Sequence, residues 1–139
     1  MENILTWKDE LATGFADVDL QHKKLILIIN DIHVAMNEPE TTYATGMAKA
    51  LKRLTEYTYY HFEEEEKFMK LHDYPEFEAH HLEHQSFIEQ VGKQIKTLSK
   101  ANSEDGFLFY RFLGSWLINH IAKSDQAWAS FVSEKTLND

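Results

Sequence analysis

The segment from residue 41 to 72 carries a regular helical pattern, and this pattern is the strongest constraint on the fold. Its inward positions follow one another at alternating spacings of four and three, and they are Met47, Leu51, Leu54, Thr58, His61, Glu65 and Phe68. An α-helix has 3.6 residues per turn, so these side chains lie along one face, the face that packs against other helices. The segment is therefore expected to be one long amphipathic helix.

Three interruptions divide the chain into helical segments. They are Pro39, Pro75 and the run "ANSEDG", which consists largely of turn formers. Proline cannot continue a helix interior, and clusters of turn formers mark loops. The helices are therefore predicted at roughly 19–37, 41–72, 76–100 and 105–133. Four long helices with short connections predict an all-α protein, an antiparallel up-down-up-down four-helix bundle.

The length of 139 residues fits one domain with a core of its own. Residues 1–18 are expected to form an N-terminal arm, with Trp7 and Phe15 as packing anchors. The bundle is expected over residues 19–133, and residues 134–139 are expected to form a C-terminal tail.

The charge balance excludes several classes of partner. The net charge is −9, with only 14 lysines and arginines, whereas binding to nucleic acid or an anionic membrane requires a basic surface. The chain has no cysteine, which excludes disulfides and thiolate metal sites. The longest aliphatic run, residues 25–29, is far too short to span a membrane, and the N-terminus has no signal-peptide pattern. A soluble, cytoplasmic protein is expected.

Several inward positions are occupied by polar side chains. They are His61, Glu65, His80, His84 and His120. A buried imidazole or carboxylate costs several kcal/mol unless it is paired or binds a metal. One such histidine would be an ordinary core residue, but a set on three predicted helices indicates a metal site.

Helical geometry selects one of the four consecutive glutamates that follow His61. At 100° per residue, Glu65 lies about 40° from His61 and one turn further along. Glu63 and Glu66 lie about 160° and about 140° away, so both are expected to face solvent, with Glu64 intermediate. Glu65 is therefore the candidate ligand.

The third and fourth predicted helices carry four candidates. His80 and His84 repeat the four-residue spacing, whereas His81 is turned away by about 100° and is expected at the surface. Asp125 follows His120 by five residues, which turns it by about 140° in a regular helix. Asp125 would have to approach from the side, or the helix would need a π-helical irregularity, a feature often found at functional sites.

The first predicted helix contributes His22, which is preceded by Asp19. Asp19 could accept a hydrogen bond from the outer nitrogen of a metal-binding imidazole. Equally, it could be an acidic residue that stabilises the helix N-terminus.

The candidate ligands include too many donors for one ion and suit two. They are His22, His61, Glu65, His80, His84, His120 and Asp125. If both carboxylates and an oxo or hydroxo group bridged two octahedral ions, one coordination position would stay empty. Imidazole and carboxylate donors suit iron but also zinc, manganese or copper, and carboxylates in a bundle core favour a di-iron centre.

The chain resembles the bacteriohemerythrins, the single-domain bacterial hemerythrin family. The matching segments are "DLQHKKL" (19–25), "HFEEEEKFM" (61–69), "YPEFEAHHLEHQSF" (74–87) and "WLINHIAKSD" (116–125). Their order and separation match over nearly the whole chain.

The resemblance implies reversible O₂ binding at a non-haem centre of two iron ions with a bridging oxo or hydroxo group. It implies that one iron is saturated by His80, His84 and His120, and that the other is held by His22 and His61 and keeps an open position. Glu65 and Asp125 would bridge the two ions. Trp116 and Leu117 would line the O₂ pocket.

These features predict an O₂-binding protein for storage, delivery or buffering rather than an enzyme. Three alternatives stay open. The chain could sense oxygen or redox state through a protein partner, which the sequence does not identify, or it could be a di-iron oxidase, peroxidase or nitric-oxide-handling enzyme. A bundle that merely stores iron is a further alternative. An enzyme would need a proton donor near the open position and room for a substrate.

Overall fold

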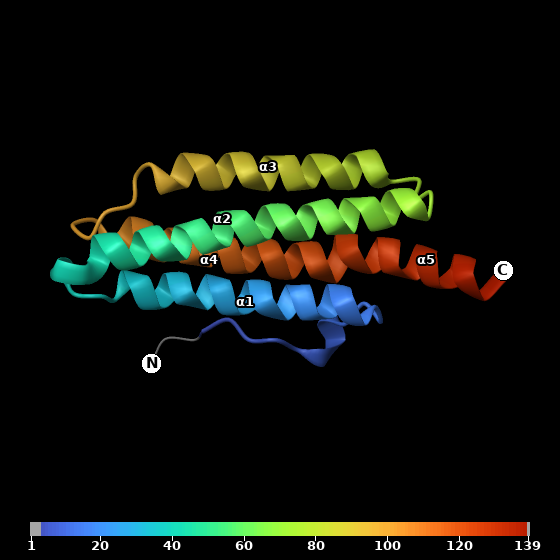
Figure 1. The fold of residues 1–139 in the computed structure, drawn as a ribbon, viewed down its shortest axis with the longest axis horizontal. Helices are drawn as coiled ribbons and strands as arrows, with labels where there is room; N and C mark the ends of the chain where they lie inside the picture. The colour runs from blue at the N-terminus through green and yellow to red at the C-terminus, as the bar shows by residue number, and fades with distance from the viewer. Residues whose placement is uncertain (1–3, 139) are drawn as a thin grey trace.

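The computed structural model describes residues 4–138 and is built from long helices that lie side by side (Figure 1). The helices are α1 (Ala16–Met36), α2 (Glu40–Leu71), α3 (Phe77–Ile95), α4 (Ser103–His120) and α5 (Gln126–Asn138). A π-helical segment, Ile121–Asp125, joins α4 to α5, so that the two form one continuous rod. The expected four-helix bundle is therefore confirmed, with α4 and α5 together as its fourth member.

Both prolines mark helix boundaries, as predicted. Pro39 stands immediately before α2, in extended conformation, and the helix begins at Glu40. At the other end, α2 stops at Leu71, and Asp73 adopts a left-handed backbone conformation with φ 54°. Pro75 then precedes α3, so the reversal between α2 and α3 is complete within a few residues.

The connection between α3 and α4 differs from its predicted position. α3 ends at Ile95 rather than at residue 100, and α4 begins at Ser103 rather than at residue 105. The side chain of Asn102 accepts a hydrogen bond from the backbone N–H of Asp105 at 3.4 Å and donates one to its carboxylate at 2.7 Å. Asn102 thus caps α4, because asparagine satisfies an otherwise unpaired N–H group at a helix start.

The N-terminal arm runs along the bundle beside α1 (Figure 1). The side chain of Asn30 binds the backbone of the arm at Leu5. It accepts a hydrogen bond from the N–H of Leu5 at 3.1 Å and donates one to the carbonyl of Leu5 at 2.7 Å. Trp7 packs against the main core, and the ring of Phe15 lies 5.6 Å from that of Trp128. Both expected packing anchors are confirmed.

The ends of the bundle extend beyond their predicted limits. α1 begins at Ala16 instead of residue 19, and α5 continues to Asn138 through residues expected to be a tail. The ammonium group of Lys135 donates to the carbonyl of His72 at 2.9 Å, which attaches the end of α5 to the end of α2. Residues 1–3 of the predicted arm and residue 139 of the tail lie outside the described residues.

Two apolar clusters lie at different levels along the bundle, with polar side chains between them. On α1, Val18 belongs to the smaller cluster and Leu25 to the larger, and His22 lies between them. On α2, Leu54 belongs to the larger cluster and Met69 to the smaller. Within the described part of the chain, no helix has both the length and the apolar character needed to cross a membrane.

Candidate metal centre

The structure brings all of the predicted ligands together in one buried layer. Each is at most 6% exposed, and the set is His22, His61, Glu65, His80, His84, His120 and Asp125. Each of the four members of the bundle, with α4 and α5 counted as one, contributes at least one of these ligands. Two of the candidate groups that could hold a metal ion consist entirely of these residues.

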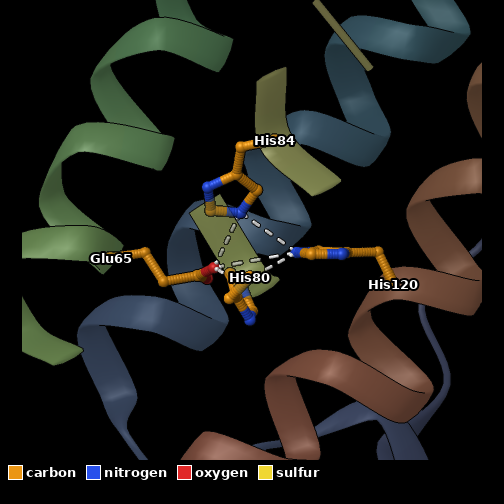
Figure 2. A group of neighbouring side chains, drawn as sticks. All are labelled: Glu65, His80, His84 and His120. Atoms are coloured by element: carbon orange, nitrogen blue, oxygen red, sulfur yellow. Dashed lines mark hydrogen bonds and ion pairs between the residues drawn. The ribbon is translucent and has the colours of Figure 1, made fainter. Parts of the chain in front are cut away.

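Three histidines converge on one oxygen of Glu65 (Figure 2). Oε1 of Glu65 lies 2.8 Å from Nε2 of His80 and 3.2 Å from Nε2 of His84. Nε2 of His120 lies 3.1 Å from the Nε2 atoms of both His80 and His84. Three imidazole nitrogens that face one another at this range form a group that can hold a metal ion.

The second group lies on the other side of the same carboxylate. Oε2 of Glu65 lies 3.2 Å from Nε2 of His61 and 3.5 Å from Nε2 of His22. Oδ2 of Asp125 lies 3.1 Å from Nε2 of His22. These four side chains also lie close enough together to hold a metal ion.

Glu65 and Asp125 each divide their two oxygens between the two groups. Oε1 of Glu65 faces the three-histidine group, whereas Oε2 faces His22 and His61. Asp125 does the same, because Oδ1 lies 3.2 Å from Nε2 of His80 and Oδ2 faces His22. A carboxylate in this position can bridge two neighbouring cations, one at each oxygen.

The π-helical segment explains how Asp125 reaches the centre. The backbone N–H of Gln126 donates to the carbonyl of Ile121, five residues earlier, in place of the usual four. Residues five apart therefore share a face, and Oδ1 of Asp125 lies 3.3 Å from Nε2 of His120. Of the two possibilities that the five-residue spacing left open, the structure has the π-helical irregularity.

Several buried atoms of the centre have no hydrogen-bond partner among the described residues. They are both ring nitrogens of His22, Oε2 of Glu65 and Oδ2 of Asp125. An unpaired buried polar atom is costly, so such atoms are normally satisfied by water or by an ion. A metal ion coordinated by Nε2 of His22 and by these oxygens would satisfy three of these four atoms, so the unpaired atoms fit a cation in the two-histidine group.

The electrostatics of the centre also favour positive charge. Burial by itself would lower the pKa of His120, but Asp125 and Glu65 raise it to about 10. The same carboxylates overcome burial at His22 and His80 and raise each pKa to about 9. Burial dominates at His61, whose pKa is lowered. Without metal, protons on three imidazoles take the place of cations beside the carboxylates.

Comparison with known proteins identifies the family. Residues 13–132 match the family model described as the hemerythrin HHE cation binding domain. The chain belongs to the hemerythrin family. It is 31% identical to the bacteriohemerythrin of Stenotrophomonas maltophilia, over 93% of this chain and 82% of that protein.

Further relatives cover the chain equally well. The bacteriohemerythrin of Methylococcus capsulatus is 30% identical over 94% of this chain and 98% of the relative. A crystal structure of a hemerythrin with a leucine-to-tyrosine substitution superimposes with a TM-score of 0.78 at 25% identity, over 95% of this chain and 99% of that one. The hemerythrin-family assignment thus rests on nearly the whole length of the chain.

The placement of Asp19 corrects one prediction for this hemerythrin domain. Its carboxylate accepts hydrogen bonds at 2.8 Å from both the backbone N–H and the hydroxyl of Thr13, and a further bond at 3.3 Å from the N–H of Gly14. Since Nδ1 of His22 has no hydrogen-bond partner in the described structure, the expected bond from His22 to Asp19 is wrong. Asp19 lies in the first turn of α1, in keeping with the alternative role at the helix start.

Glu66 was expected to face solvent, and this expectation is also wrong. Its side chain is only 17% exposed and accepts hydrogen bonds from Nδ1 of His84 and Nδ1 of His81, each at 2.7 Å. Burial would raise the pKa of Glu66, but these histidines hold it below its usual value. The periodicity of α2 could not reveal this contact because it depends on where α3 lies.

Three more residues contact the candidate ligands without having been predicted. Nδ1 of His61 donates to the amide oxygen of Gln21 at 2.7 Å, and Oε2 of Glu83 lies 2.9 Å from Nδ1 of His120. The indole N–H of Trp128 donates to Oδ1 of Asp125 at 3.1 Å. The spacing of three residues between Asp125 and Trp128 is a signal that could have indicated this last contact.

Trp116 lies beside the three-histidine group, and Leu117 precedes His120 by three residues on the same helix. The indole of Trp116 stacks on the ring of His120, with 4.4 Å between ring centroids, and it also lines a surface groove of about 640 Å³ between α3 and α4. Leu117 is buried in the larger apolar cluster. Their assignment to an O₂ pocket stays a prediction.

Proposed function

We propose that this chain binds O₂ reversibly at a centre of two iron ions and serves to store, deliver or buffer oxygen. The observation that carries the proposal is the division of the Glu65 and Asp125 oxygens between a three-histidine group and a two-histidine group. This arrangement supports two unequal metal positions joined by two bridging carboxylates.

In this proposal His80, His84 and His120 hold one ion, and His22 and His61 hold the other. An oxo or hydroxo group would complete the bridge, and the position with two histidines would keep one site open for a small ligand. The donor set supports iron, because imidazoles and carboxylates in a helical bundle core are the usual ligands of di-iron proteins. Two iron ions, once bound there, would supply the electrons that O₂ accepts reversibly.

The surroundings of the centre favour binding over turnover. Phe62 stacks on His84 with 3.7 Å between ring centroids, and Trp116 covers His120. Both rings lie against imidazoles of the three-histidine group, the position proposed to be saturated, and hold those imidazoles in place. An enzyme would need a proton donor, and the hydroxyl of Tyr110, which is close in sequence to the candidate ligands, donates its hydrogen bond to Asn30 at 2.8 Å.

The relatives support the same assignment. The proteins named bacteriohemerythrin match this chain over most of its length, and the family model is named for cation binding. A carrier function for this chain is consistent with these names and with the geometry of the centre.

A cycle of reduction, exposure to air and removal of oxygen tests the proposal. The iron-loaded protein should contain two irons per chain and should develop a charge-transfer absorption band in air that fades when oxygen is removed. The same protein loaded with zinc is the matched control. Zinc binds to the same kinds of ligand but is not oxidised by O₂, so no such band should appear. A band that decays irreversibly would contradict a carrier function and favour turnover or sensing.

A further inference from the structure

The two histidine groups differ in the charge of the residues behind them. In the three-histidine group, Nδ1 of His84 donates to the carboxylate of Glu66 at 2.7 Å. Nδ1 of His120, in the same group, lies 2.9 Å from Oε2 of Glu83. Two of the three imidazoles at this position are therefore backed by negative charge.

The two-histidine group has no comparable carboxylate behind its imidazoles. Nδ1 of His61 donates to Gln21, whose amide oxygen is neutral, at 2.7 Å. Nδ1 of His22 has no hydrogen-bond partner within residues 4–138. Carboxylates therefore contact two outer nitrogens of the three-histidine group, whereas the outer nitrogens of the two-histidine group contact no carboxylate among the described residues.

This difference changes how strongly each imidazole donates electrons to a metal. An imidazole whose N–H group is held by a carboxylate becomes more basic, and residues of this kind commonly alter metal affinity by about 10–100-fold when they are replaced. A more basic ligand stabilises the ferric ion more than the ferrous ion, because the extra electron density matters most for the higher charge. A neutral amide orients the ring with a much smaller electronic effect.

We infer that Glu66 and Glu83 are positioning residues that make the three-histidine position the stronger electron-donating site, whereas Gln21 keeps the two-histidine position weaker. The two irons are then unequal not only in ligand number but also in the charge behind their ligands. This inference rests on the proposed di-iron function and assigns roles to residues that do not themselves contact the metal.

Glu66 is better placed than Glu83 to act in this way. Its second oxygen accepts a hydrogen bond from Nδ1 of His81 at 2.7 Å, so both carboxylate oxygens are fixed. Its side chain is 17% exposed, against 47% for Glu83, which lines the groove next to His120. Because solvent screens an exposed charge more effectively, replacing Glu66 should have the larger effect.

The test is the reduction potential of the iron-loaded protein with Glu66→Gln. Glutamine keeps an acceptor oxygen for His84 but removes the charge, so the ferric centre should lose stability and the potential should rise. A tenfold change in the relative stability of the ferric and ferrous forms corresponds to about 59 mV for one electron. Glu63→Gln is the matched control, since Glu63 is 69% exposed and pairs with Lys67 on the same helix.

The reciprocal substitution protects the test against misfolding of one variant. Gln21→Glu keeps the acceptor for His61 and adds a charge, so the potential should fall. Both shifts should persist at high salt, because partly buried charge pairs are screened far less than exposed ones. Iron content and thermal unfolding, measured on the same samples, show whether each variant keeps its centre.

The outcomes separate this inference from the proposed function. Two irons per wild-type chain, with equal potentials in Glu66→Gln and Glu63→Gln, would overturn the inference and leave the di-iron centre intact. Absence of iron from the wild-type protein would overturn both. The inference is supported if the reduction potential rises in Glu66→Gln and falls in Gln21→Glu.

Discussion

His120 and Asp125 are five residues apart, yet Nε2 of His120 lies 3.3 Å from Oδ1 of Asp125 at the centre of the bundle. A regular α-helix would turn Asp125 by about 140° away from His120. The π-helical segment Ile121–Asp125 removes this difference and leaves α5 in line with α4 (Figure 1). The irregular segment is therefore what completes the set of buried ligands.

Replacing Glu65 should empty the centre. Glu65→Ala removes a carboxylate that belongs to both candidate ligand groups, so iron content should fall far below that of the wild type. Glu63→Ala, on the exposed side of the same helix, should retain the wild-type iron content. Elemental analysis of the purified variants checks this, and equal iron in the two would remove Glu65 from the ligand set.

Replacing Asp19 should weaken the fold without removing metal. Asp19→Ala loses the hydrogen bonds to Thr13 and Gly14, and hydrogen bonds to charged groups contribute about 1.5–3 kcal/mol each when buried. Because Asp19 is only partly buried, a loss of about 1–2 kcal/mol in the free energy of unfolding is expected.

Denaturant unfolding measures this loss, with the exposed first-turn residue in Asp17→Ala as control. Iron content should equal that of the wild type. If Asp19→Ala instead lost iron while its free energy of unfolding stayed unchanged, the result would support a hydrogen bond between His22 and Asp19.

Trp128 should hold one bridging carboxylate in position. Trp128→Phe keeps an aromatic ring in the small apolar cluster but removes the N–H group that donates to Asp125. Residues that orient metal ligands typically change metal affinity by about 10–100-fold, so iron should transfer faster to a competing chelator. Trp7→Phe is the control, since Trp7 packs against the larger cluster through the arm. Equal transfer rates in the two variants would contradict the role.

Metal loading should release protons. In the metal-free protein the pKa values of His22, His80 and His120 are raised to about 9, 9 and 10, so all three imidazoles carry protons at pH 7. Ligand nitrogens must lose these protons to bind, so loading at pH 7 should release about three protons per chain.

The sign of the pH dependence follows from the raised values. Since protons compete with metal below pH 9, the apparent affinity for ferrous iron should fall as the pH is lowered. Titration calorimetry in buffers of different ionisation enthalpy counts the protons under anaerobic conditions. Loading without proton release would show that these imidazoles are neutral before metal binds.

Ligands that share a helix could be predicted because regular helical spacing is a local property. His61 with Glu65, and His80 with His84, follow from four-residue spacing on one face. The five-residue spacing of Asp125 from His120 does not suit a regular helix, so the sequence alone could show only that some irregularity or side approach was needed. The structure shows that a π-helical segment brings Asp125 to the centre.

Contacts between separate elements could not be predicted in the same way. Glu66 points away from His61 along α2, but α3 packs on that side and brings His81 and His84 to it. Asp19 has a suitable spacing from His22, yet the chain reversal at Gly14, with φ 89°, presents backbone N–H groups to it instead. Such contacts depend on how the elements pack, which periodicity within one helix does not contain.

Anomalous diffraction at the iron edge, from crystals of the iron-loaded protein, tests the central claim most directly. Two separate iron peaks are predicted, one among Oε1 of Glu65 and the three histidines of Figure 2, the other among Oε2 of Glu65, His22 and His61. Glu65 and Asp125 should each contact both peaks. A single peak, or two peaks that share neither carboxylate, would contradict a bridged pair of irons.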